Sequence, residues 1–170
     1  MTTFRAVMHG FALLLLSCLS CIPTGCQYDP WASGFLTAKP NEREIVGNYL
    51  IDADSQNRRI KLPMSNQLLP IIPSAQIVLT SDHKAEFVDV PEEEHGQYPC
   101  SVTGHGSWNV EKHDNFYEVR ANITNETASG RCKGQFGYEL MLYGRKPPYK
   151  LHITIGDPDS GDAVQFAKQR

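Results

Sequence analysis

Apolar and polar residues alternate with a period of two along several short stretches of this chain, and this pattern restricts its fold more than any other feature. Residues 116–123 and 149–155 are the clearest examples. Such alternation is typical of antiparallel strands that bury one face. Short clusters of turn-forming residues separate the stretches. About eight strands are expected, which predicts an all-β fold, an antiparallel meander closed as a barrel or folded as a sandwich.

Two segments interrupt this alternation. Ile60–Pro73 contains three prolines, which excludes a central strand there. We expect one short helix over Met64–Leu69, because a proline directly precedes it. Pro91–Pro99 contains three consecutive glutamates and is expected to form an acidic loop between two strands.

A strand expected over Val102–Val110 has two unusual features. Gly104 and Gly106 lie inside it, and glycines within a strand indicate a bulge or a close approach of another backbone. Trp108 follows on the same strand. We expect its large side chain to be buried at the centre of the core.

The first two dozen residues indicate export. Arg5 precedes an apolar run over Phe11–Leu19, and no acidic residue occurs before this run. The run has the length of the apolar part of a signal peptide and is far shorter than the ~20 apolar residues that a membrane-spanning helix needs. We therefore predict a cleavable signal peptide over residues 1–25.

Three cysteines lie where this signal peptide would be cleaved. Thr24-Gly25-Cys26 resembles the lipobox of bacterial lipoproteins, in which a small residue precedes a cysteine that becomes acylated, for example with palmitate. Cys18 and Cys21 are alternative acylation sites, and an ordinary secretory signal is another alternative. We favour Cys26, because it leaves a full apolar run before it and a polar, turn-rich segment after it.

The chain that remains after cleavage is long enough for one domain. Residues 26–43 are expected to form a lipidated N-terminus and tether, and residues 44–170 a β-barrel-like domain. Loss of Arg5 leaves fifteen Lys and Arg against nineteen Asp and Glu, a formal net charge of −4. This charge offers no general attraction for nucleic acid, and no nucleic-acid partner is expected.

Two cysteines remain outside the signal region. Cys100 and Cys132 form an even pair once Cys26 carries lipid, and an oxidising envelope favours a disulfide between them. The alternative is two separate buried thiols. A bridge over roughly 30 residues would stabilise the fold by ~3–4 kcal/mol.

No residue pattern indicates catalysis, a metal site or a cofactor. Asp157, Asp159 and Asp162 have the residue type of calcium ligands but not the register of an EF-hand, so we interpret them as parts of a turn. The five histidines after the signal region lack the short spacing of a zinc site, and we expect them to be exposed. Ser81-Asp82-His83 are adjacent residues of a turn and cannot converge as a catalytic triad.

Two short motifs carry a family resemblance. Gly47-Asn48-Tyr49 and Gly106-Ser107-Trp108 are similar to the strand openings of small bacterial lipocalin-like lipoproteins, and the order of lipobox, tether and strands also resembles that family. The resemblance implies a lipocalin-like barrel that a lipid anchor holds on an envelope membrane, the outer membrane in a Gram-negative cell. Because no catalytic pattern occurs in the sequence, we expect a non-enzymatic role.

Two ligand classes fit this expectation. Lipocalin-like barrels often bind a small apolar ligand in their interior, which is the first expectation for this chain. The alternative is an envelope protein-binding module, such as an inhibitor of a hydrolase. A contiguous apolar cavity would favour the ligand, whereas a filled core with a protruding loop such as Pro91–Pro99 would favour the protein partner.

Overall fold

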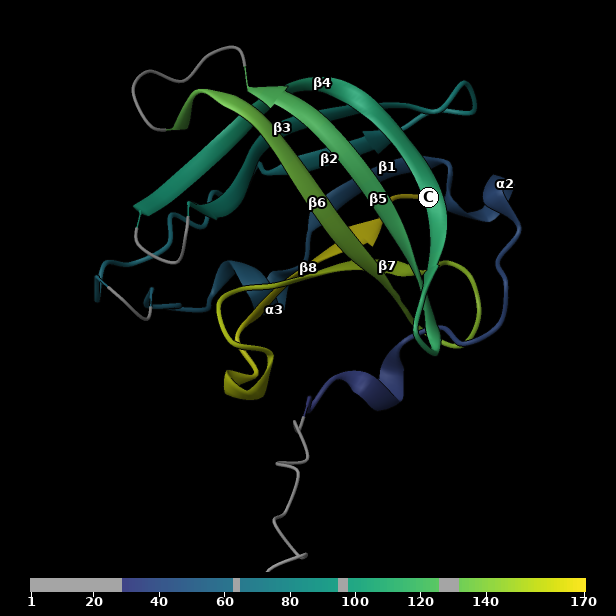
Figure 1. Ribbon diagram of the computed structural model, residues 1–170, viewed down its shortest axis with the longest axis horizontal. Helices are drawn as coiled ribbons and strands as arrows, with labels where there is room; N and C mark the ends of the chain where they lie inside the picture. The colour runs from purple at the N-terminus through teal and green to yellow at the C-terminus, as the bar shows by residue number, and fades with distance from the viewer. Residues whose placement is uncertain (1–28, 63–64, 95–97, 126–131) are drawn as a thin grey trace, which may run out of the picture.

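The chain folds into a closed, eight-stranded antiparallel β-barrel (Figure 1). The computed structural model describes residues 29–62, 65–94, 98–125 and 132–170. The strands are β1 (Gly47–Ile51), β2 (Gln76–Leu79), β3 (Lys84–Glu94), β4 (Tyr98–His113), β5 (Phe116–Asn125), β6 (Gly134–Tyr143), β7 (Lys150–Thr154) and β8 (Ala163–Lys168). The helical turns are η1 (Ala32–Gly34), α2 (Glu42–Ile45), α3 (Ala53–Gln56) and η3 (Pro158–Ser160). The all-β prediction is confirmed, in its barrel form.

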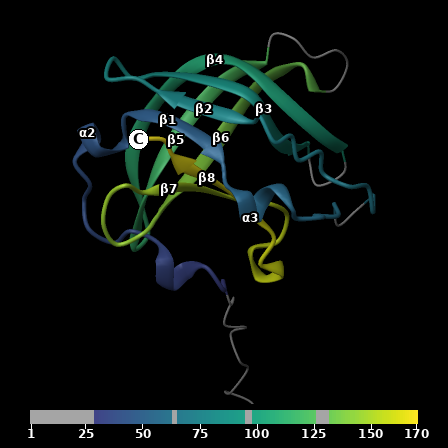
Figure 2. The same ribbon diagram turned by 180° about the vertical axis from the view of Figure 1, so that it is seen from behind.

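Each strand pairs with the next one along the chain, and β1 pairs with β8 to close the ring. The closing register joins Tyr49 to Lys168 and Ile51 to Phe166. The long strands β3 to β6 form one curved wall, and the short strands β1, β2, β7 and β8 form the other (Figure 2). This order is the simple meander that the short connecting turns predict.

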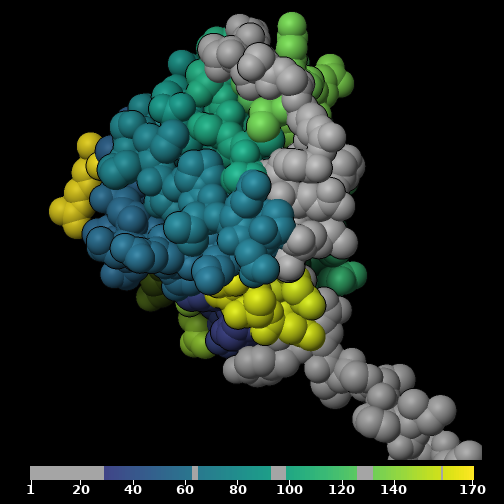
Figure 3. Space-filling view, turned by 90° about the vertical axis from the view of Figure 1, so that its left-hand side faces the viewer, coloured from purple at the N-terminus to yellow at the C-terminus, as the bar shows by residue number. Residues whose placement is uncertain are grey.

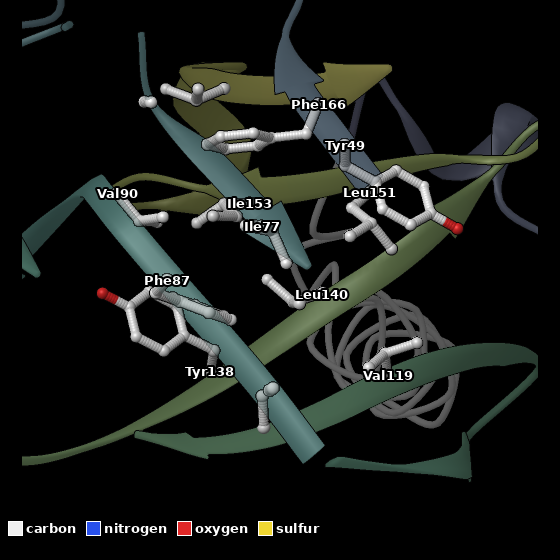
Figure 4. Close-up of a cluster of buried hydrophobic side chains, with 14 of the residues drawn as sticks. Tyr49, Ile77, Phe87, Val90, Val119, Tyr138, Leu140, Leu151, Ile153 and Phe166 are labelled. Carbon is white, nitrogen blue, oxygen red and sulfur yellow. The ribbon is translucent and has the colours of Figure 1, made fainter. Parts of the chain in front are cut away.

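The barrel encloses an apolar core. Tyr49, Phe87 and Phe166 are its largest fully buried side chains. Figure 4 shows ten labelled residues of this core, contributed by strands around the whole ring: Tyr49, Ile77, Phe87, Val90, Val119, Tyr138, Leu140, Leu151, Ile153 and Phe166. Trp108 is 3% exposed and belongs to the same cluster, so its predicted burial is confirmed. It lies at one end of the ring, where its indole Nε1 donates to the carbonyl of Thr80 (3.1 Å).

The two glycines of β4 permit a close approach of β5. A Cβ atom on Gly104 would lie 1.8 Å from the carbonyl oxygen of Thr124, and one on Gly106 would lie 1.7 Å from that of Asn122. Larger residues are therefore excluded at both positions. The expected irregularity also occurs, but on the neighbouring strand, where an extra residue between Phe87 and Val90 bulges out of the β3–β4 ladder.

The helix predicted over Met64–Leu69 is wrong for its described part, residues 65–69. Lys61 and Leu68 instead form an isolated bridge, and Asn66 has a positive φ of 57°. The backbone of Leu69 donates to Ile60, and both side chains enter the core. Burial of these alternating apolar residues outweighs the weak helical signal of a preceding proline.

The acidic loop predicted over Pro91–Pro99 is shorter than expected. Strand β3 continues to Glu94 and β4 begins at Tyr98, with Pro91 opposite Ser101. Strand β2 pairs with β3 only as far as Val88, so Pro91 lies on an edge where no ladder hydrogen bond is lost.

Candidate functional site

The interior of the barrel, which is the expected ligand site, is filled by side chains. The rings of Phe87 and Tyr138 lie 4.8 Å apart between centroids, and Leu140, Leu142 and Leu151 are fully buried in the same core. The hollows at residues 32–38, at Glu92, at Arg58 and at His105 open at the surface rather than into this core. The described side chains therefore occupy the space that a ligand would need, as expected for a small eight-stranded barrel.

The pairing between β6 and β7 is short within the described strands. These strands pair only through Met141–Tyr143, although β6 begins at Gly134. A hollow of about 210 Å³ follows, lined by Glu92, Gly137, Tyr138, Glu139, Met141, Ile153 and Thr154. Burial and the Glu92 carboxylate beside it raise the pKa of Tyr138 well above its usual value, so this phenol remains protonated.

The predicted disulfide is present and fastens one end of the barrel. Cys100 and Cys132 are bonded, with their Cα atoms 5.6 Å apart. The buried amide of Asn125 lies beside them, and its Nδ2 donates to the carbonyls of Ser101 (3.2 Å) and Cys132 (2.7 Å). The start of β4 is thereby tied to the segment that leads into β6. Beyond Val90, β3 and β4 pair only with each other within the described strands, so this end is an extension of the ring.

A cluster of charged residues lies on the outer face of β4, β5 and β6. Glu118 is 1% exposed, with Arg120 Nη2 3.4 Å from its Oε1 and His113 Nδ1 3.3 Å from its Oε2. Arg120 also donates to Glu139 Oε1 at 2.6 Å. Burial raises the pKa of Glu118, the Glu139 charge raises it further, and His113 and Arg120 oppose both.

This cluster has the dimensions of a metal site but already contains a cation. Each of His113, Glu118 and Glu139 offers one possible ligand atom, and these three atoms lie within 4.8 Å of one another. The guanidinium of Arg120 contacts both carboxylates, which places a fixed positive charge where an ion would bind. We interpret the cluster as an ion-pair network that stabilises the wall.

The N-terminal segment, which was expected to form a tether, packs on the outer face of β6 and β7. The Trp31 indole Nε1 donates to the carbonyl of Gly161 (3.0 Å), and the Arg58 guanidinium lies 5.2 Å from the centre of the Trp31 ring. Phe35 is 5% exposed and forms a bridge with Tyr143. Figure 3 shows this purple segment next to the yellow loop that contains Gly161.

This segment buries His152, which the sequence indicated would be exposed. The imidazole is 0% exposed and lies 5.1 Å from the Trp31 ring and 5.2 Å from the Phe35 ring, between centroids. Its Nδ1 is 3.2 Å from Nε2 of Gln165, whose Oε1 accepts from Lys150. Burial lowers the pKa of His152 to about 4, so the imidazole is neutral at physiological pH. The prediction failed because alternation within a strand does not show that another segment covers its outer face.

The other candidate residues from the sequence lie apart. In the loop before β8, Asp157 Oδ1 accepts from the backbone of Asp159 (3.0 Å), as in an ordinary turn. Asp82 pairs with Lys84 (2.6 Å), whereas the neighbouring His83 ring lies 5.1 Å from the Trp108 ring between centroids, tilted by 40°. Cys18, Cys21, Cys26 and the whole of the predicted signal peptide lie outside the described residues.

Comparisons with models of protein families, with curated proteins and with solved structures gave no match. Within residues 29–62, 65–94, 98–125 and 132–170, no helix is long and apolar enough to cross a membrane.

Proposed function

We propose that this chain is a membrane-anchored envelope lipoprotein whose barrel is a non-enzymatic binding module for another envelope protein, such as a hydrolase that it inhibits. The anchor is acylated Cys26. The observation that carries the proposal is the filled interior of the barrel, since it directs binding to the outer surface.

The end of the barrel with the Cys100–Cys132 bridge is the surface best suited to a protein partner. There the paired ends of β3 and β4 extend beyond the ring. Glu92, which is half-buried, lies on this extension. The bridge and the Asn125 amide hold this extension in one conformation, which reduces the entropy lost on binding. It also lies far from the anchor, because β6 runs from this end to Tyr143, beside the N-terminal segment (Figure 1).

The anchor is tested by metabolic labelling with palmitate. The wild-type chain should incorporate the label and Cys26→Ser should not. Equal labelling of both would move the site to Cys18 or Cys21, and no labelling of either would refute the lipoprotein proposal.

Binding at the outer surface is tested with an apolar fluorescent probe such as anilinonaphthalene sulfonate and with native mass spectrometry. The wild-type barrel should not bind the probe. Leu140→Ala, which opens a cavity and should cost about 2–5 kcal/mol of stability, is the positive control. A lipid-sized mass that copurifies with the wild-type protein from its own host would favour the small apolar ligand instead.

The partner-binding end is tested by photo-crosslinking in the host envelope. A benzophenone amino acid at Pro99, on the extension, should give a protein adduct, and the same label at Glu86, on the outer wall, should not. Adducts from both positions, or from Glu86 alone, would contradict the assignment of this end.

A further inference from the structure

The segment that follows Cys26 is held firmly against the barrel, so little of it can act as a tether. The backbone of Gly144 donates to the carbonyl of Gly34 (2.9 Å), and that of Leu36 donates to Leu142 (2.8 Å). The fit at Gly34 is tight, because a Cβ atom there would lie 2.1 Å from the Tyr143 ring. Together with the Trp31 contacts, these bonds fix the chain from Asp29 to Leu36.

This attachment leaves a very short link to the lipid. Three residue steps separate Cys26 from Asp29, and a fully extended chain covers at most about 11 Å over that distance. The polar headgroup layer of a bilayer is roughly 5–8 Å thick on each side. If Cys26 is acylated, as proposed above, the end of the barrel that carries η1 must lie at the headgroups.

The surface beside η1 carries exposed basic residues. Arg145 and Lys146 form the tip of the β6–β7 turn, whose first residue, Gly144, bonds to Gly34. Arg145 also lines an open hollow of about 420 Å³, together with Ser33 and Thr37. An arginine and two hydroxyl residues around one hollow suit a phosphate group.

Acidic residues of the same end lie on the other side of Trp31. Asp157 and Asp159 are exposed in the loop that Trp31 contacts through Gly161. The basic turn beside Gly34 and the acidic loop beside Trp31 therefore carry opposite charges. An anionic membrane would attract the first and repel the second.

We propose that the η1 end of the barrel is a membrane-contact surface, in which Arg145 and Lys146 bind the phosphates of anionic phospholipids and tilt the barrel toward its β6–β7 turn. The proposal rests on acylation of Cys26. It places the disulfide end away from the bilayer and accessible to a partner.

The test uses the processed, full-length lipoprotein in vesicles of phosphatidylethanolamine that contain about 30% of the anionic lipid phosphatidylglycerol. The anionic lipid supplies the negative surface potential that attracts basic residues. A benzophenone amino acid replaces Ser33 next to the hollow or, as a control, Thr124 near the disulfide end. Irradiation should give phospholipid adducts, seen as mass shifts, at position 33 and not at position 124.

Charge variants test the role of the basic turn. Arg145→Gln should lower the adduct yield at position 33 about fivefold, the effect expected for one basic residue at an anionic surface. Lys133→Gln removes the same charge at the far end and should leave the yield unchanged. Vesicles of phosphatidylcholine alone should abolish the difference between the two variants.

Three results would overturn the proposal. Equal lipid adducts at positions 33 and 124 would show that the barrel has no fixed orientation. Competition by millimolar inorganic phosphate would show a site for free phosphate rather than for a membrane. A chain without palmitate would refute the anchor and this proposal together, whereas a chain with palmitate and no adduct at position 33 would refute only the contact surface.

Discussion

Acid should destabilise this barrel mainly through one imidazole, that of His152. His152 lies on β7, and the N-terminal segment covers its ring completely. Only Nδ1 of the ring has a hydrogen-bond partner among the described residues. Protonation would place a positive charge among the aromatic rings of Trp31, Phe35 and Tyr143, beside the Arg58 guanidinium. Burial and then the Arg58 charge lower the pKa of His152 to about 4 for this reason.

The size of the effect follows from proton linkage. In the unfolded chain His152 has its ordinary pKa of about 6.5, so below that pH the unfolded state binds a proton that the folded state excludes. The contribution of the neutral His152 to the free energy of unfolding is therefore fully present above pH 6.5. It decreases as the pH falls from 6.5 toward 4. The loss from this residue is about 2 kcal/mol at pH 5 and about 3 kcal/mol at pH 4.

Glu118 acts in the opposite direction, because its raised pKa makes the folded state bind a proton more readily as the pH falls. A comparison of variants removes this contribution. Urea unfolding of the wild type between pH 7.5 and pH 4.5 should show a steeper loss of stability than that of His152→Gln. The exposed His105 supplies the control, since His105→Gln should keep the wild-type slope.

The reasoning is refuted if His152→Gln has the same pH dependence as the wild type. If that variant does not fold, the wild type gives the answer directly by NMR, where the His152 imidazole should titrate near pH 4. A midpoint near 6.5 would show that the N-terminal segment does not cover the ring in solution.

Three other perturbations have definite expected results. Replacing Cys100 and Cys132 together by alanine should lower the free energy of unfolding by about 3–4 kcal/mol, and non-reducing peptide mapping should find the two cysteines joined in the wild type. Trp108→Ala should cost about 3–5 kcal/mol in urea unfolding, and a loss below about 1 kcal/mol would contradict its burial. Calcium and chelator should leave the melting temperature unchanged, and a calcium-dependent rise that Asp159→Asn abolishes would overturn the interpretation of that loop as a simple turn.

The inner face of the barrel could be predicted from the sequence because it depends on local alternation. Val119, Ala121 and Ile123 all point inward on β5, as their spacing of two requires. The glycines of β4 were informative for the same reason, because a strand residue without a side chain indicates that another part of the backbone comes close to it. The Cys100–Cys132 bridge could be expected by simple elimination, with no knowledge of the fold.

The outer face could not be predicted, because it depends on contacts between distant parts of the chain. Nothing near His152 in the sequence shows that Trp31 and Phe35 cover it. Glu118 lies on the polar face of β5 and is buried by its neighbours on other strands. The aromatic residues within the supposed tether were the one available signal, since exposed Trp and Phe side chains without a partner are unfavourable.

Closure of the ring by β1 and β8 has a consequence for how the chain folds. The paired residues Tyr49 and Lys168 are roughly 120 positions apart, whereas every other strand pair joins neighbours along the chain. Hairpins can therefore form early, but the ring closes only when β8 reaches β1. Until then β1 and β7 each have an unpaired edge that can bind another chain. A folding chaperone would be needed most during this interval, and its natural targets are these two edges.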